Sequence, residues 1–270
     1  MIQSSVNYLD EMDEMPVFYA QKTENNLKLS THAITVEDAR ALDSTQTLER
    51  EGFGLFHRPT AVRNFRDTQE VMRVYRPEIA ELLTGLTGAR KVLVTGPVLR
   101  WSESSRDYGT LLNSRAARFV HIDYSRKSFD EFARHHLQSA GIEDIEPWLR
   151  GRYAAYNFWR VLTPPPQDVP LGVCSARTVR PADMVTGMAV VDPPNGPELK
   201  FESSLIRFNP AHRWFYYPNM RPDEALVFKA FDSDRASLQG CPHSAFNDPS
   251  CPPDVEPRGS VEIRAYAYYG

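Results

Sequence analysis

Short apolar segments dominate the chain from about residue 118 onwards. They are rich in β-branched and aromatic residues, and Pro, Gly, Asp or Asn bound each of them, which is the pattern of short β-strands. Successive segments read FVHIDYS, AAYNFWRVL, PLGVCSARTV, SSLIRFNP, HRWFYYP, EALVFKAFDS and SVEIRAYAYY. Because helical patterns do not alternate with these strands, the series is typical of a sandwich or jelly roll rather than of a βαβ fold.

Helical signals are more frequent earlier in the chain. Asp67 stands three residues before Glu70, which is the spacing of a capping box, and Pro77 suits the start of a further helical segment. One later helix interrupts the strands, and we expect it to start at Ser128 and to stop at Gly141.

These patterns predict a mainly β protein with flanking helices, folded as a single domain over residues 1–270. We expect a mixed α/β region in residues 1–115, which includes the apolar strand KVLVTG. This region would pack on an all-β core formed by residues 116–270.

The charge balance and the cysteine count exclude several classes of protein. Acidic residues number 35 and basic residues 31, so the net charge of −4 gives no reason to expect a nucleic acid or an anionic membrane as partner. Apolar runs stay far below the ~20 residues that span a bilayer, and the acidic start has no signal-like apolar stretch. The three cysteines include no CxxC pair. We therefore expect a cytoplasmic protein with reduced thiols.

His121 and Asp123 are the first candidates for chemistry, because they flank Ile122 within a predicted strand. Residues two apart in a strand project to the same face, so an imidazole and a carboxylate would enter one space together. This is half of the 2-His-1-carboxylate set that binds non-haem Fe(II). A hydrogen-bonded pair at a strand edge is the alternative interpretation.

A third ligand must come from a distant strand that folds back beside the first. His243 follows the apolar strand EALVFKAFDS, and Arg258 and Ser260 follow fifteen and seventeen residues later. A guanidinium with a hydroxyl two residues on can hold the far carboxylate of a dicarboxylic acid. His212 and Cys241 are weaker alternatives as ligands. His212 is more typical of a core or pocket residue, and Cys241 of a small buried apolar one.

Long stretches of the chain also resemble a known family. The matching segments are VNYLDE, ITVEDAR, LEREGFGLFHRPTAVRNF, VYRPEIAELLTGLTGARKVLV, VHIDYS, YNFWR, PLGVCSARTV, FNPAHRWFYYPNMRPDEALVFKAFDS, PHSAFNDP and PRGSVEIRAYAYY. Together they cover nearly the whole chain, which resembles the CmcJ/NvfI-type oxidoreductases. That family includes a fungal gibberellin desaturase and a component of cephamycin 7-methoxylation.

The resemblance implies a double-stranded β-helix core, which is a jelly roll of the cupin-like kind. It implies Fe(II) and 2-oxoglutarate as cofactors and O₂ as co-substrate. The reaction would oxidise an unactivated C–H bond of a small molecule in secondary metabolism. By position, His121, Asp123 and His243 correspond to the catalytic iron ligands, and Arg258 corresponds to the anchor of 2-oxoglutarate.

We assign two further residues to cofactor binding. Ser260 is expected to orient the co-substrate together with Arg258, and Asn157 lies on a strand that should cross the same barrel. Asn157 and Trp159 share one face of that strand and Arg160 the other, so only one of these sets can face the iron.

Several alternatives stay open at this point. An iron oxygenase that does not use 2-oxoglutarate would employ Arg258 to hold a substrate carboxylate, and Arg264 is an alternative anchor. A non-catalytic accessory subunit on the same fold is a function of a different class. The sequence does not decide between hydroxylation, desaturation and oxidative cyclisation, and it leaves a homodimer open.

Overall fold

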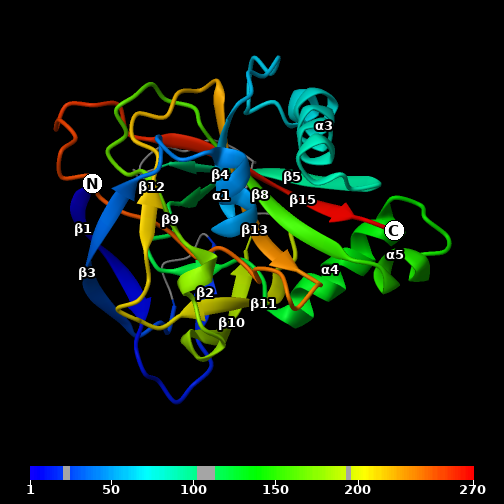
Figure 1. The fold of residues 1–270 in the computed structure, drawn as a ribbon, viewed down its shortest axis with the longest axis horizontal. Helices are drawn as coiled ribbons and strands as arrows, with labels where there is room; N and C mark the ends of the chain where they lie inside the picture. The colour runs from blue at the N-terminus through cyan, green and yellow to red at the C-terminus, as the bar shows by residue number, and fades with distance from the viewer. Residues whose placement is uncertain (21–24, 102–112, 193–195) are drawn as a thin grey trace.

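Two β-sheets lie face to face and make up most of the protein, with a few helices around them (Figure 1). The computed structural model describes residues 1–20, 25–101, 113–192 and 196–270. Apolar side chains from both sheets pack together in one buried cluster that includes Ile122 and Trp214 from one sheet and Ala155 and Tyr266 from the other. The arrangement is therefore a sandwich with a shared interior.

The larger sheet has nine strands in the described part of the chain. In spatial order they are β1 (Ile2–Leu9), β3 (Leu29–Asp38), β12 (Trp214–Tyr216), β9 (Leu171–Cys174), β14 (His243–Ala245), β7 (His121–Ile122), β11 (Leu199–Ile206), β10 (Met184–Val191) and β2 (Val17–Tyr19). Strands far apart in the sequence are neighbours here, which is the long-range pairing expected of a jelly roll.

The smaller sheet has six strands among the described residues. They are β4 (Phe53–His57), β13 (Glu224–Asp232), β8 (Tyr153–Val161), β15 (Gly259–Tyr268), β5 (Lys91–Trp101) and β6 (Asn113–Arg115). The central pair, β8 and β15, is buried along nearly its whole length. The expected mainly β jelly-roll class is confirmed.

Five α-helices and a π-helical turn accompany the sheets in the described residues. They are α1 (Ser44–Arg50), α2 (Thr68–Glu70), the π-helical turn (Val71–Tyr75), α3 (Arg76–Thr87), α4 (Arg126–Ser139) and α5 (Glu146–Arg150). Short 3₁₀ turns cover Ala176–Thr178 and Pro181–Asp183.

Helix α3 covers the outer face of the smaller sheet beside β5 and β15 (Figure 1). Ile79 and Leu83 of α3 are buried in a cluster with Val261 and Ala265, which lie on the same face of β15. The intervening residues of β15 must then point into the sandwich. Covering one face with an apolar helix is thus what directs the polar side chains of this strand to the interior.

Two local expectations differ from the structure. The helix expected to start at Ser128 starts one turn earlier, because the Ser125 hydroxyl accepts the backbone N–H of Ser128 and the Ser128 hydroxyl in turn accepts the backbone N–H of Ser125. Pro77 does not restart a separate helix, since α2, the π-helical turn and α3 are continuous from residue 68 to residue 87. Asp67 caps this helix as predicted, accepting from the backbone N–H groups of Gln69 and Glu70.

The two sides of the expected boundary at residue 115 are interleaved in space. Strands from residues 1–115 lie in both sheets, with β1, β2 and β3 in the larger one and β4, β5 and β6 in the smaller one. The division into a core and a region packed on it remains a proposal.

Candidate metal centre

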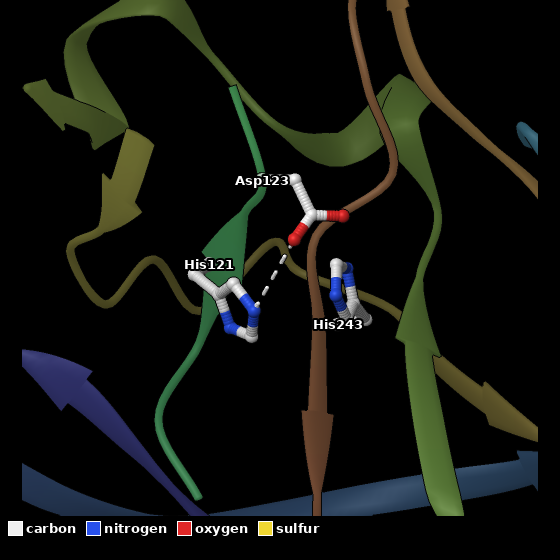
Figure 2. A group of neighbouring side chains, drawn as sticks. All are labelled: His121, Asp123 and His243. Carbon is white, nitrogen blue, oxygen red and sulfur yellow. Dashed lines mark ion pairs between the residues drawn. The ribbon is translucent and has the colours of Figure 1, made fainter. Parts of the chain in front are cut away.

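His121 and His243 lie side by side on neighbouring strands of the larger sheet. They are directly paired between β7 and β14, and their ring centroids are 4.3 Å apart. Asp123 follows β7 immediately and points to the same space (Figure 2). All three side chains are buried, and one ligand atom from each lies within 4.8 Å of the others. The structure therefore brings together the three residues that the sequence singled out.

Both imidazoles are oriented by the main chain. Nδ1 of His121 is 3.0 Å from the Phe119 carbonyl oxygen, and Nδ1 of His243 is 3.2 Å from the Cys241 carbonyl oxygen. Because a carbonyl can only accept, each Nδ1 carries a proton, and each Nε2 is the nitrogen left for a metal. This is the tautomer of a metal-binding histidine with its outer nitrogen anchored.

The two Nε2 atoms face the centre of the group. Among the described residues, Nε2 of His243 has no hydrogen-bond partner, although it is buried. Nε2 of His121 lies 4.0 Å from Oδ1 of Asp123. Burial and the neighbouring His243 lower the pKa of His121 to about 3, so its ring is neutral, as a metal ligand must be.

Asp123 is held from the opposite sheet. Nδ2 of Asn157 donates to Oδ2 at 2.5 Å, and a guanidinium nitrogen of Arg264 donates to Oδ1 at 2.7 Å. Burial alone would raise the pKa of this carboxyl, but Arg264 and the two histidines keep it well below its usual range. Asp123 is therefore ionised and fixed in orientation.

Arg258 lines the same pocket as His121 and His243. The other residues that line this pocket are Arg100, Ala116, Ala117, Trp159, Leu171, Ala245 and Glu262. Arg258 is 1% exposed, and burial lowers its pKa to about 10. It donates to the Val169 carbonyl at 2.8 Å and to the Ser260 hydroxyl at 2.5 Å.

A buried guanidinium normally has an acidic partner. Within the described part of the chain, none of the ion pairs includes Arg258; Asp168 lies nearby but accepts from the backbone N–H of Arg258, not from the guanidinium. The Ser260 hydroxyl accepts from this guanidinium, and the role expected of Ser260 in orienting the co-substrate stays a prediction. Asn157, which we expected against the cofactor, contacts Asp123.

The sequence did not predict a row of charged side chains beside the three candidate metal ligands. Glu262 accepts from Arg264 at 2.6 Å and lies 3.6 Å from Nε of Arg100. Glu262 and Arg264 lie two and four residues after Ser260 in β15 and so share its face, whereas Arg100 comes from β5. No pattern in the sequence indicated that β5 would pair with β15.

The remaining candidates lie away from the three ligand atoms. His212 is bound by Tyr8 at 3.0 Å and by Asp183 at 3.2 Å. Cys241 contributes its carbonyl to His243, while its own thiol donates to the Cys174 carbonyl at 3.1 Å. Arg160 faces the other side of β8, where its Nε donates to the Tyr75 hydroxyl at 3.1 Å.

The donor set fits Fe(II). Two imidazoles and one carboxylate, buried together beside a pocket, are the ligand set of the facial arrangement that leaves positions open for other ligands. The buried Nε2 of His243 has no role within the described protein, which is what a ligand atom looks like without its metal. The Arg258 guanidinium beside the Ser260 hydroxyl fits one end of a dicarboxylate.

Comparison with known proteins assigns the chain to a family. The profile described as "Oxidoreductase/YMDC permease-like domain" matches residues 6–268, and the chain belongs to that family. Hydroxylase/desaturase asaB of Aspergillus flavus is 30% identical over 206 residues, which cover 72% of this chain and 89% of asaB. Fe(II)/2-oxoglutarate-dependent dioxygenase nvfI of Aspergillus novofumigatus is 28% identical over 254 residues, covering 92% of this chain and 87% of nvfI. The resemblance to the CmcJ/NvfI-type oxidoreductases is confirmed.

Solved structures agree on the fold. A structure described as "iron and alpha-ketoglutarate-dependent endoperoxidase NvfI with different conformation" superposes with a TM-score of 0.83 at 24% identity, over 100% of this chain and 98% of that one. Within the described residues, no helix of this protein is long and apolar enough to cross a membrane.

Proposed function

We propose that this protein is an Fe(II)/2-oxoglutarate-dependent oxygenase that oxidises an unactivated C–H bond of a small molecule in secondary metabolism. The observation that carries the proposal is the buried group of His121, Asp123 and His243. The two histidines share a pocket with Arg258, a buried guanidinium without an ion pair in the described residues. The names of the relatives, which are dioxygenases and hydroxylase/desaturases, support the same chemistry.

Each residue has a distinct task in this proposal. His121, Asp123 and His243 hold the metal, which supplies O₂ activation coupled to decarboxylation of 2-oxoglutarate. Arg258 binds the far carboxylate of 2-oxoglutarate, and Ser260 keeps the guanidinium in place. Because these groups are oriented beforehand, they reduce the freedom that the co-substrate must lose on binding.

Arg258 is a better anchor than Arg264. The guanidinium of Arg264 already donates to Asp123 and to Glu262, two carboxylates that compensate its charge. Arg258 lines the pocket and has no such pair, so a bound carboxylate would remove the cost of burying its charge.

The decisive test is an anaerobic titration of the apo-protein with Fe(II) and then with 2-oxoglutarate. We expect the weak visible charge-transfer band of the chelated co-substrate. His243→Ala should abolish iron binding, and Arg258→Gln should bind iron but need far more 2-oxoglutarate to give the band. Arg264 provides the comparison: if Arg264→Lys alone raised the 2-oxoglutarate requirement, the anchor would move to that residue.

The outcomes also separate the alternatives that the sequence left open. Iron binding without the band would favour an oxygenase that does not use 2-oxoglutarate. Absence of iron binding would favour the accessory subunit, and turnover by the isolated protein would exclude it. We further propose a cytoplasmic location, to be tested by cell fractionation, and gel filtration will decide whether a homodimer forms.

A further inference from the structure

Asn157 is a buried amide that uses only one of its two polar atoms. Its Nδ2 donates to Asp123, while its Oδ1 has no hydrogen-bond partner among the described residues. The residue is 0% exposed, so water does not reach it freely. An orphaned buried oxygen destabilises a fold, and leucine would fill a similar volume without that cost. Stability therefore does not account for an amide at this position, and its contact with Asp123 does.

Arg264 stands directly opposite Asn157 in the pairing of β8 with β15. Side chains of directly paired residues lie on the same face, so both enter the sandwich together. Asn157 bonds Oδ2 of Asp123, and Arg264 bonds Oδ1. Two neighbours on one sheet thus hold the two oxygens of a carboxylate on the other sheet, and this carboxylate cannot turn without breaking one of the two bonds.

The position of Arg264 is itself fixed. Its guanidinium donates to Glu262, and its backbone N–H donates to the Thr95 hydroxyl at 3.2 Å. The Thr95 contact falls where the register of β15 against β5 shifts, between Ile263 and Ala265. The side chain of Thr95 thus replaces a ladder partner at an irregularity that also orients Arg264.

We propose that Asn157 and Arg264 are positioning residues that fix the orientation of Asp123 for metal binding. The inference rests on the proposed function. Each carboxylate oxygen can accept two bonds, and one site on each oxygen is already taken. The second site on each oxygen stays free for a metal. Oδ1 is the oxygen that faces Nε2 of His121, at 4.0 Å.

Asn157 and Arg264 together form a clamp on Asp123. Because the clamp orients the carboxylate beforehand, Asp123 would lose little rotational freedom when a metal binds.

Charge alone would act in the opposite direction. The guanidinium of Arg264 repels a cation, so removing it should tighten metal binding if electrostatics dominated. Asn157 is neutral, and its replacement changes no charge. A loss of affinity in both cases is therefore the signature of positioning.

The test uses Co(II) alone as probe, because its visible absorption reports coordination. Apo wild-type protein, Asn157→Leu and Arg264→Met are titrated with Co(II) by calorimetry, and their spectra and melting temperatures are recorded. We expect Asn157→Leu to bind Co(II) about 10- to 100-fold more weakly with an altered spectrum. Its apo form should melt at an unchanged or higher temperature. Arg134→Met, which removes an exposed ion pair with Glu146, is the matched control and should bind as wild type.

The result that overturns the inference is wild-type affinity and spectrum in Asn157→Leu. Tighter binding by Arg264→Met would also overturn it, in favour of simple charge tuning. Should Asn157→Leu fail to fold, Asn157→Ala removes the same bond without filling the space, and the same two readouts apply. If wild-type protein itself does not bind Co(II), the proposed metal centre fails, an outcome that differs from failure of the clamp alone.

Discussion

Three buried side chains at this site each have a polar group without the partner that a buried group normally has. Nε2 of His243 and Oδ1 of Asn157 are buried without hydrogen-bond partners in the described chain, and Arg258 is buried without an ion pair there. An unsatisfied buried polar group costs about 1–3 kcal/mol. A bound metal would complete Nε2 of His243, and a bound carboxylate would complete the Arg258 guanidinium.

Two histidines with buried side chains, His212 and His243, offer a matched comparison. The ring of His212 is bonded at both nitrogens, whereas that of His243 is bonded at one. We expect His212→Gln to lower the free energy of unfolding by about 2 kcal/mol and to leave Co(II) affinity unchanged. His243→Gln should leave the free energy of unfolding nearly unchanged and should weaken Co(II) binding. Urea unfolding of the apo-protein and metal titration distinguish the two, and metal loss in His212→Gln would contradict the ligand assignment.

Spacing in the sequence predicted His121, Asp123, His243 and Arg258, because residue types and strand periodicity determine which faces they share. It did not predict the contact between Asn157 and Asp123. That contact depends on how the two sheets are stacked, and a single strand contains no information about the strand it faces.

Among the strands, β15 does the most to organise the pocket. Its inward residues line the pocket, while its outward residues pack under α3. The alternation of its residues was visible in the sequence, but its pairing with β5 was not, because β5 lies about 160 residues earlier. The start of α4 was misplaced for a related reason, since Ser125 and Ser128 both suit a cap and the structure uses them as a pair.

Gly259, at the start of β15, is constrained by its neighbour on β5. A Cβ atom at this position would meet the ring of Trp101. We expect Gly259→Ala to destabilise the protein by about 1–3 kcal/mol through overpacking and to weaken 2-oxoglutarate binding, because Arg258 and Ser260 flank it.

A glycine in the adjacent strand provides the control for this substitution. A Cβ atom added to Gly96 would meet no other atom within 4 Å, so Gly96→Ala should change stability far less. Thermal melts of both variants, with the charge-transfer titration described above, measure the two effects. Equal stability losses would show that the contact with Trp101 is unimportant.

For the whole molecule, stability should fall as the pH drops below the ordinary pKa of histidine. Burial and the neighbouring His135 and Arg76 lower the pKa of His136 to about 4, and burial also lowers the pKa of His212. The unfolded chain therefore binds these protons near pH 6.5, whereas the folded protein binds them only at lower pH. Stability from these groups is full above about pH 6.5 and is lost toward about pH 4.

Urea unfolding of the apo-protein at pH 7, 6 and 5 measures this slope. Each histidine that titrates only in the unfolded state contributes at most about 1.4 kcal/mol per pH unit. His136→Gln should make the slope shallower, because it removes a group whose pKa is lowered on folding. A slope that is the same in His136→Gln would mean that other groups cause the acid sensitivity.

Because His121 and His243 lie on different strands, a metal ion bound by both would also cross-link the polypeptide. It would join two points 122 residues apart (243 − 121), across more than two fifths of the chain. Unlike a disulfide, this cross-link forms and breaks as the concentration of free metal changes. Well above the dissociation constant, each tenfold rise in free metal should add about 1.4 kcal/mol of stability. The time for which the enzyme stays folded would then depend on the concentration of free iron in the cell.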